Sequence, residues 1–325
     1  MNVAIIGCGG MGRMHAQMAQ NCGFNVVSCV DKDVSLAKKL AKELDAHATH
    51  DTSGAIRRPD VDVVCITTPT PRHSATVTAA AKAGKHIFCE KPFGRTMQQC
   101  RSALNEVKRT KVKLFVGHVV RYFQEFETMK AQLEAGKIGT PGFTRIYRGG
   151  IFPGGPGSWF HDYQQSGGVI LDTMIHDLDW VCYVFGKPVR IFGQALRRTE
   201  PEMMDYGQVT MTMDSGLIAS FTGTWAHPQG FRVKAEICGD GGMLQFDSAD
   251  APIATQTRAS AQAGPTMIVP GSPMDVSPYQ LEWADFKAWL EEDREPRVTP
   301  DDAVRAVEIA LGALKSADTG KPVKL

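Results

Sequence analysis

The chain has 325 residues, of which 43% are hydrophobic and 22% charged, and its formal net charge is +1. This length suits one large domain or two ordinary ones, and this composition is typical of a soluble globular protein. The near-zero charge argues against nucleic acid or an anionic membrane as the main partner. No apolar run approaches the length of a membrane span.

The chain contains eight cysteines, none of which forms a C-x-x-C pair, and several lie inside apolar runs such as Val64-Cys65-Ile66. This pattern favours free buried thiols in a reducing compartment over a disulfide framework or a zinc site. Met1 leads directly into an apolar strand pattern, without a basic leader or a cleavage site. We therefore expect a cytoplasmic protein.

A glycine-rich turn lies close to the start of the chain. A strand is predicted over 2–6, a helix over 11–21 and a second strand over 24–30, which ends at Asp31. Strand, G-x-G-x-x-G, helix, strand and acid, in that order, predict a dinucleotide site; the alternative is a turn that binds nothing. The expected cofactor contacts are Gly7, Gly9, Gly10, Met11, Gly12 and Asp31. Asp31 would accept hydrogen bonds from the adenosine ribose and repel a 2′-phosphate, so we expect NAD, with NADP as the alternative.

Helices and apolar strands continue to alternate up to about residue 120. Helices are predicted over 35–44, 71–83 and 96–109, and strands over 61–66, 85–89 and 112–116. Near-continuous apolar strands between helices indicate a doubly wound parallel sheet that is covered on both faces. We assign residues 1–120 to a Rossmann domain that binds NAD. A further helix is predicted over 125–135.

The second half of the chain has a different pattern. Strands of alternating polarity are predicted over 143–147, 189–195, 207–213, 217–225, 231–238 and 242–246. They indicate an open, mainly antiparallel sheet, so the fold class is α/β with residues 121–325 as a second domain. Segments 149–158 and 249–273 are predicted as loops, the first of them mobile. Helices over 278–291 and 301–317 close the chain, with packing of the C-terminal helix back on the first domain as an alternative to its place in the second.

A helix predicted over 169–185 carries two lines of side chains. Its apolar line consists of Leu171, Met174, Ile175, Leu178, Cys182 and Phe185. Its polar line consists of Asp172, His176, Asp179 and Tyr183. A carboxylate and an imidazole at i and i+4 can touch, and the carboxylate can then orient the imidazole as a general acid or base. The alternative is an amphipathic helix with a solvated polar face.

Four segments carry a resemblance to one family. The segment 83–92, A-G-K-H-I-F-C-E-K-P, closely resembles a signature of the glucose–fructose oxidoreductase, inositol dehydrogenase and rhizopine-catabolism family (Gfo/Idh/MocA). Thr68-Pro69 with His73 is similar to its T-P-x-x-x-H segment, and residues 117–123 resemble the segment after its last Rossmann strand. Residues 167–179 resemble its G-G-x-x-x-D-x-x-x-H-x-x-D motif. The match covers nearly the whole chain in order.

This resemblance implies an NAD(P)-dependent oxidoreductase acting on a secondary alcohol of a sugar, an inositol or a related polyol. It implies homodimers or homotetramers formed through the C-terminal sheet, and a cis peptide bond before Pro92. It also implies that Lys91, Asp172 and His176 are the catalytic residues and meet at the nicotinamide. The chemistry fits, because His176 can take the hydroxyl proton and Lys91 can stabilise the developing alkoxide.

The remaining expectations concern binding residues. Further cofactor contacts are expected at Thr67, Thr68, Pro69, His73, Glu90 and Lys91. Substrate contacts are expected at Lys91, Arg121, Trp159, Tyr163, Asp172 and His176. His15 and His73 could instead be structural histidines, Arg121 could pair with an acid, and the aromatic residues before the helix could simply pack together. Asp179 could bind a substrate hydroxyl.

Two rival interpretations remain open. Asp172, His176 and Asp179 could ligate a divalent ion, but Lys91 would compete for that space, and a nicotinamide needs no metal to accept hydride, so no metal is expected. The second rival is a non-catalytic protein that senses NAD(H) or binds a partner on the same fold.

Overall fold

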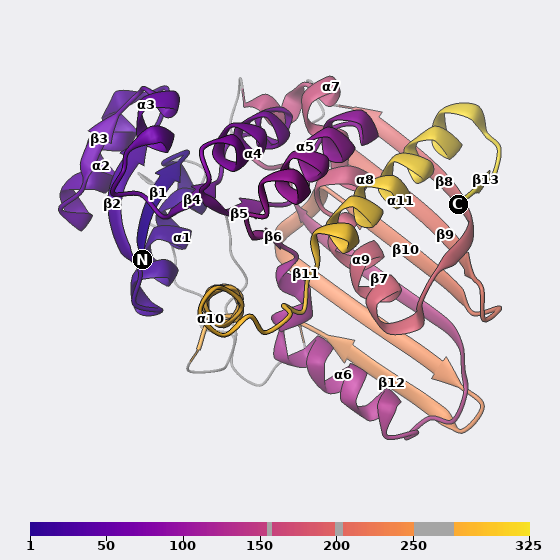
Figure 1. Cartoon of the computed structure of the whole chain (residues 1–325). Helices are drawn as coiled ribbons and strands as arrows, with labels where there is room; N and C mark the ends of the chain where they lie inside the picture. The colour runs from indigo at the N-terminus through magenta and orange to yellow at the C-terminus, as the bar shows by residue number, and fades with distance from the viewer. Residues whose placement is uncertain (155–157, 199–203, 250–275) are drawn as a thin grey trace. The chain divides into compact units, whose positions relative to one another are not determined.

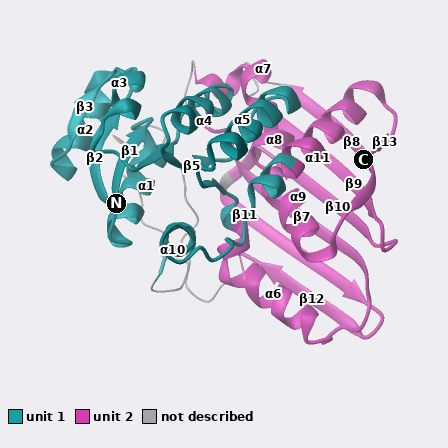
Figure 2. Ribbon diagram, viewed as in Figure 1, with its two compact units in different colours: residues 1–119, 276–304 teal, residues 120–275, 305–325 magenta. Residues whose placement is uncertain are grey.

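The computed structural model describes residues 1–154, 158–198, 204–249 and 276–325. It divides into two compact units, the first containing residues 1–119 and 276–304 and the second residues 120–275 and 305–325 (Figure 2). The sequence prediction divides the chain once, after residue 120. In the structure the segment 276–304 groups with the N-terminal residues instead.

Unit 1 is built on a parallel sheet with the strand order β3-β2-β1-β4-β5-β6 (Figure 1). The strands are β1 (Asn2–Ile6), β2 (Asn25–Val30), β3 (His47–Thr49), β4 (Val63–Ile66), β5 (His86–Glu90) and β6 (Leu114–Gly117). Every residue of β4 and β6 is buried, as expected for strands covered on both faces. The Rossmann prediction is confirmed. Only β3 is missing from the sequence analysis, because its three residues form no apolar run.

Helices cover this parallel sheet. They are α1 (Gly10–Asn21), α2 (Val34–Leu44), α3 (Thr52–Arg57), α4 (His73–Lys82), α5 (Met97–Thr110) and α10 (Pro278–Glu292), with a short 3₁₀ turn η1 (Thr70–Arg72). Helix α5 begins with a capping box between Thr96 and Gln99. The short α3 begins at its cap Asp51 and was not predicted. In α10, the ring of Trp283 stacks on Phe88 of β5 with centroids 4.4 Å apart, which joins this late helix to the core of unit 1.

Unit 2 is built on a sheet with the strand order β12-β11-β7-β10-β9-β8-β13. The strands are β7 (Pro141–Ile151), β8 (Pro188–Arg198), β9 (Met204–Met213), β10 (Ile218–Thr224), β11 (Ala226–Gly239), β12 (Gly242–Asp247) and β13 (Val323–Lys324). Within the described part of this second sheet, only β7 and β10 pair in parallel, and the other neighbouring strands pair antiparallel. The prediction of a mainly antiparallel sheet is therefore confirmed. Strand β7 continues to Ile151, so the predicted loop at 149–158 begins too early. Residues 155–157 of that loop and nearly all of the predicted loop 249–273 lie outside the described residues.

Helices cover one face of this sheet and leave the other open (Figure 1). They are α6 (Gln124–Glu134), α7 (Tyr163–Ser166), α8 (Gly168–Asp172), α9 (Ile175–Phe185) and α11 (Pro300–Thr319), with 3₁₀ turns η2 (Val119–Tyr122) and η3 (Trp159–His161). Helix α8 lies very close to the strands beneath it, because a Cβ on Gly207 would lie 2.6 Å from Cγ1 of Ile170. Among the helices that the structure describes, none has both the length and the apolar character to cross a membrane.

The predicted helix over 169–185 is wrong as a single element, because it is divided into α8 and α9. The N–H of Met174 donates to the carbonyl of Val169, five residues back, which makes one turn wider than an α-helical turn. The predicted apolar line survives this break, since Leu171, Met174, Ile175, Leu178 and Cys182 are all buried. Asp172 and His176 therefore lie on either side of a wide turn, and not one above the other on a regular helix.

Candidate functional site

The three motif glycines of the turn between β1 and α1 have three different surroundings. Gly7 has a φ of +103°, and a Cβ there would lie 2.8 Å from the backbone of Thr67. A Cβ on Gly12 would lie 1.8 Å from the carbonyl oxygen of Gly7, so this glycine permits close packing of helix on strand. A Cβ on Gly9 would meet nothing within 4 Å. Gly9 thus leaves open space at the N-terminus of α1, where a pyrophosphate could approach the backbone.

Residues at the carboxyl ends of β2 and β4 surround this turn. The carboxylate of Asp31 accepts hydrogen bonds from the N–H groups of Cys8, at 2.7 Å, and Asp33, at 2.9 Å. The hydroxyl of Thr67 donates to the carbonyl of Gly7 at 2.7 Å. The buried hydroxyl of Thr68 has no hydrogen-bond partner among the described residues. An open glycine, an acid at the end of β2 and an unsatisfied hydroxyl fit a bound dinucleotide.

The turn after β5 contains Glu90, Lys91 and Pro92, and the Lys91–Pro92 peptide bond is cis, as the resemblance implies. Oε2 of Glu90 accepts from the N–H of Lys91 at 3.0 Å, and Oε1 lies 2.7 Å from Nε2 of His15. The indole of Trp283 donates to Nδ1 of that histidine at 3.1 Å. Because an indole N–H can only donate, Nδ1 accepts, and Nε2 carries the proton that is donated to Glu90.

Glu90 is consequently a buried carboxylate that stays ionised. Burial by itself would raise its pKa, but the hydrogen bond from His15 and the charge of Lys91 lower the pKa further than burial raises it. His15 is fully buried in this pair, as expected if it is a structural histidine. Glu90 therefore helps to fix the turn that carries Lys91.

His73 links two of the predicted cofactor segments. Its Nδ1 lies 2.7 Å from the carbonyl oxygen of Pro92, and its Nε2 lies 2.6 Å from that of Thr68. Burial lowers the pKa of His73, and the two carbonyl acceptors oppose that shift. The ring thereby ties the segment after β4 to the turn after β5.

A second acid, Glu282 of α10, is buried close to this turn. Neither of its carboxyl oxygens has a hydrogen-bond partner among the described residues. Burial, together with the charge of Glu90, raises the pKa of Glu282 well above its ordinary value. The burial of Glu282 therefore favours its protonated form, whereas the partners of Glu90 favour its charged form. The sequence offered no signal for this acid, since α10 follows β5 by nearly 190 residues.

In unit 2, the acids of α8 and α9 fall into two groups. Asp177 and Asp179 are buried, and each forms a two-pronged ion pair with a buried arginine, Arg148 and Arg121 respectively. Asp172 and His176 are half-buried. A buried ion pair holds its members in place, whereas Asp172 and His176 keep part of their surfaces exposed.

Arg121 contacts the last two residues of the predicted polar line, Asp179 and Tyr183. Its guanidinium lies 2.7 Å from Asp179 and 4.4 Å from the ring centroid of Tyr183. The alternative that Arg121 pairs with an acid is therefore realised in the structure. Since Asp179 is engaged in this way, it is poorly placed to join Asp172 and His176 as metal ligands, and no cluster of the described residues is arranged to hold a metal ion.

Aromatic residues gather around the wide turn between α8 and α9. Phe152 and Phe160 make edge contacts with Trp225, whose indole donates to the hydroxyl of Thr173 at 2.7 Å. The predicted Trp159 packs against Phe160, and Tyr163 lies under the guanidinium of Arg197. Sequence reasoning missed the contact between Thr173 and Trp225, because they are 52 residues apart and Thr173 is an unspecified position of its motif.

Asp205 of β9 caps α8. Its Oδ2 accepts from the N–H of Val169 at 2.7 Å, near the glycines that precede the motif acid. Burial raises the pKa of Asp205 to about 6, although this hydrogen bond opposes the shift.

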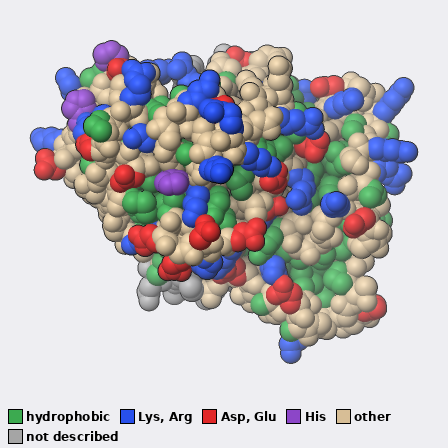
Figure 3. Space-filling view, viewed as in Figure 1, with side chains coloured by type: hydrophobic (Ala, Val, Ile, Leu, Met, Phe, Trp, Pro, Cys, Tyr) green, Lys and Arg blue, Asp and Glu red, His purple; other side chains and the backbone are tan. Residues whose placement is uncertain are grey.

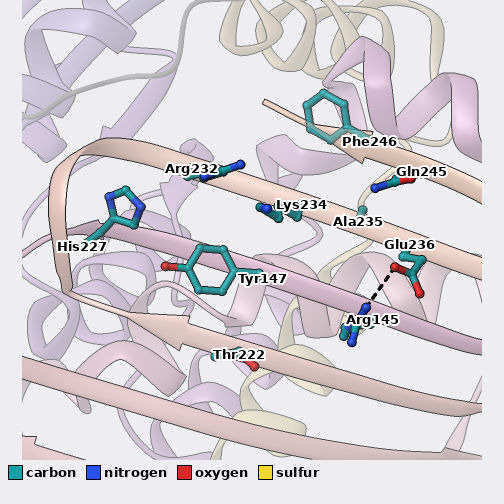
Figure 4. Close-up of a pocket in the computed structure, with 10 residues that line it drawn as sticks. All are labelled: Arg145, Tyr147, Thr222, His227, Arg232, Lys234, Ala235, Glu236, Gln245 and Phe246. Carbon is teal, nitrogen blue, oxygen red and sulfur yellow. Dashed lines mark hydrogen bonds and ion pairs between the residues drawn. The ribbon is translucent and has the colours of Figure 1, made fainter. Parts of the chain in front are cut away.

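The open face of the unit 2 sheet has a shallow hollow of about 490 Å³ (Figure 4). Basic residues line it, but Arg145 pairs with Glu236, while Arg232 and Lys234 both pair with Asp247. Acidic and basic side chains are also interspersed over the face of the molecule drawn in Figure 3. Neither the hollow nor this face of the described residues therefore shows a single-sign patch that would favour nucleic acid.

Comparisons with known proteins agree with the fold of both units. A family model described as an oxidoreductase family with an NAD-binding Rossmann fold matches residues 1–118, and a GFO/IDH/MocA C-terminal domain model matches residues 126–245. Scyllo-inositol 2-dehydrogenase (NAD(+)) of Bacillus subtilis is 29% identical over 99% of this chain and 95% of its own length. Myo-inositol 2-dehydrogenase of Thermotoga maritima is 28% identical over 100% of this chain and 98% of its own. The crystal structure of myo-inositol 2-dehydrogenase from Lactobacillus plantarum superposes with a TM-score of 0.84 at 25% identity, covering 100% of this chain and 99% of that one.

Proposed function

The chain belongs to the Gfo/Idh/MocA family of oxidoreductases with an NAD-binding Rossmann fold, and from that premise we propose that it oxidises a secondary alcohol of an inositol, a sugar or a related polyol. The names of its relatives support a cyclitol as the first substrate to test, since those compared above are inositol dehydrogenases. NAD is the expected cofactor.

One observation carries the assignment of the chemistry to α8 and α9. Of the three aspartates in Asp172–Asp179, two are buried against arginines, and only Asp172 is half-buried, as is His176 four residues later. A group that transfers a proton must be reachable by the substrate. This pair meets that condition, whereas Asp177 and Asp179 serve the framework.

Each residue then has a defined role in the proposal. NAD, when bound, accepts the hydride from the alcohol carbon. His176 takes the hydroxyl proton, and Asp172 orients its imidazole and stabilises the imidazolium. Lys91 donates a hydrogen bond to the substrate oxygen and stabilises its developing negative charge. In the reverse reaction His176 returns the proton to the carbonyl oxygen.

The cofactor part of the proposal rests on unit 1. The open side of Gly9 and the N-terminus of α1 would receive the pyrophosphate. The carboxylate of Asp31 would accept from the adenosine ribose in place of one of its present N–H donors. The hydroxyl of Thr68 would gain a partner from the nucleotide.

We also propose a homodimer or homotetramer formed through the unit 2 sheet. The exposed side chains on its open face include Leu196, Tyr206 and Ile218, which are large and apolar. Such side chains favour contact with another protein surface. A cytoplasmic location is part of the same proposal, supported by the eight cysteines, none of which forms a disulfide in the described residues.

A screen for NADH formation tests the function. The protein is offered NAD, and in parallel NADP, with inositols, aldoses, and deoxy and amino sugars, and absorbance is followed. We expect NADH with at least one cyclitol or sugar and a much weaker response with NADP. Stoichiometric NAD binding with no NADH across the panel would favour a sensor instead, and dominant NADP activity would contradict the role of Asp31.

A further inference from the structure

A chain of two hydrogen bonds joins the indole of Trp225 to the carboxylate of Asp172. Nε1 of Trp225 donates to Oγ1 of Thr173 at 2.7 Å, and this hydroxyl donates to Oδ2 of Asp172 at 3.3 Å. Trp225 lies between β10 and β11, and Thr173 lies in the wide turn between α8 and α9. Thr173 occupies an unspecified position of the motif over residues 167–179, and Trp225 lies outside the four segments that resemble the family.

The chemistry of the three groups fixes the direction of this chain. An indole N–H can only donate, so the oxygen of Thr173 must accept from it. The hydroxyl proton of Thr173 is then left to be donated, and the carboxylate of Asp172 is the acceptor within reach. The order from indole to hydroxyl to carboxylate cannot be reversed, so the carboxylate receives a proton donor from one defined side.

The donor at the start of the chain is held rigidly. The side chain of Trp225 is buried, and the rings of Phe152 and Phe160 make edge contacts with it at centroid distances of 5.1 and 5.8 Å. Its backbone N–H donates to the carbonyl of Asp205 at 2.8 Å. The sheet therefore supplies a fixed reference point for a carboxylate that sits beside an irregular turn of helix.

We propose that Thr173 and Trp225 are positioning residues, which hold the carboxylate of Asp172 in the orientation in which it acts on His176. This inference rests on the proposed function of Asp172 and His176. The wide turn leaves Asp172 at the end of α8 without the regular helical ladder beyond it. The hydroxyl of Thr173, which accepts from the indole of Trp225 next to β10, supports the carboxylate of Asp172 instead.

Matched variants test the hydroxyl itself. Thr173→Val keeps the shape of the side chain but removes both hydrogen bonds, and Thr173→Ser keeps the hydroxyl. We expect Thr173→Val to lower kcat by about 10- to 100-fold with little change in the KM for NAD, because a misplaced catalytic group costs turnover. Thr173→Ser should restore turnover to within about threefold of the wild type, and Trp225→Phe should fall between them.

A double-mutant cycle with Asp172→Asn separates positioning from general damage. If Thr173 acts through Asp172, Thr173→Val should cost little further activity in the Asp172→Asn background. Equal losses from Thr173→Val and Thr173→Ser, or additive losses in the cycle, would overturn the proposal. Wild-type turnover in Thr173→Val beside an impaired Asp172→Asn would overturn it while leaving the proposed function intact.

A measurement that does not depend on enzyme activity tests the proposal in the case that no substrate is found. In nitrogen-15 spectra, the indole N–H signal of Trp225 should move in Thr173→Val and stay close to its wild-type position in Thr173→Ser. An indole signal that is unchanged in Thr173→Val would overturn the proposal even if a substrate were never found. If the signal moves but Asp172→Asn keeps full turnover, the hydrogen bond stands, while the positioning role fails together with the proposed function of Asp172.

Discussion

Each unit places a carboxylate residue and a histidine in its candidate site, and the two sites differ in how deeply these residues are buried. In unit 1, Glu90 and His15 are buried, and Trp283 and the N–H of Lys91 occupy the remaining positions around them. In unit 2, Asp172 and His176 are half-buried and lie on either side of an irregular turn. A pair whose donors and acceptors are satisfied inside the protein holds the backbone in place, whereas a pair that ligands can reach is suited to proton transfer.

The same contrast recurs within α9. Asp177 and Asp179 are each fixed by a buried arginine, although both lie within a few residues of His176. Position in a motif therefore does not predict which acids are held in buried ion pairs. Whether burial and partners also decide which acid takes part in the reaction can be tested one residue at a time.

The largest effect is expected from removing the imidazole of the accessible pair. His176→Ala should lower kcat/KM by about 10²- to 10⁴-fold, which is the usual contribution of a general acid or base. NAD binding, followed by fluorescence titration, should be nearly unchanged. His50→Ala, which removes an exposed histidine of unit 1, is the control and should match the wild type.

The buried ion pairs should respond in the opposite way. Asp177→Ala leaves the guanidinium of Arg148 buried without its partner, so the free energy of unfolding should fall by about 3–5 kcal/mol. Asp172→Ala should cost about 1 kcal/mol or less in the same urea titration, but should lose turnover. Equal stability losses in the two variants would remove the distinction between framework acid and reactive acid.

Asp205, which caps α8, allows a test of how the free energy of unfolding depends on pH. Its pKa is raised from an ordinary value of 3.8 to about 6 in the folded protein, so the folded state binds this proton more tightly than the unfolded state does. The stability linked to this group is fully present below about pH 4 and is lost as the pH rises through about 6, a change of about 3 kcal/mol.

Asp205→Asn should flatten that part of the stability profile, because the amide keeps an acceptor for the N–H of Val169 but cannot ionise. The measurement is the urea midpoint of wild type and variant from about pH 4 to about pH 7. Parallel profiles would show that Asp205 does not carry the shift.

The smallest expected effect separates the two kinds of glycine in the turn after β1. Gly9→Ala adds a methyl group into open space, so stability should hold while the affinity for NAD falls about 10-fold, or about 1.4 kcal/mol. Gly12→Ala forces a methyl group against the carbonyl of Gly7 and should lower stability itself. Calorimetric NAD titration and thermal unfolding distinguish these outcomes, and unchanged affinity in Gly9→Ala would contradict the pyrophosphate site.

The fold of unit 1 could be predicted from the sequence because the patterns that indicate it lie close together in the chain. Except for β3, the strands lie in mainly apolar runs, and Gly7 to Asp31 form one continuous motif, so the Rossmann fold could be predicted directly, and the cofactor residues named from that motif remain a prediction. The apolar line of the helix at 169–185 was equally clear. Its break at Thr173 was not, because a single wide turn leaves the spacing of the buried residues almost unchanged.

The rest of the candidate site depends on partners that are distant in the chain. Arg121 meets Asp179 across 58 residues, Trp225 meets Thr173 across 52, and Trp283 meets His15 across 268. No periodicity or motif encodes such pairs. The sequence could therefore list the polar residues of the site, but only the fold could divide them into those that are fixed and those that are accessible.

The central claim is that His176 carries the proton in an NAD-dependent oxidation. Its most direct test is single-turnover NADH formation, measured from about pH 6 to about pH 9 in wild type and in His176→Ala, each loaded with NAD beforehand. We predict that the wild-type rate rises with pH as an imidazole loses its proton, and that His176→Ala loses this rise together with most of the rate. If the same rise persists in His176→Ala, another group takes the proton and the claim is contradicted.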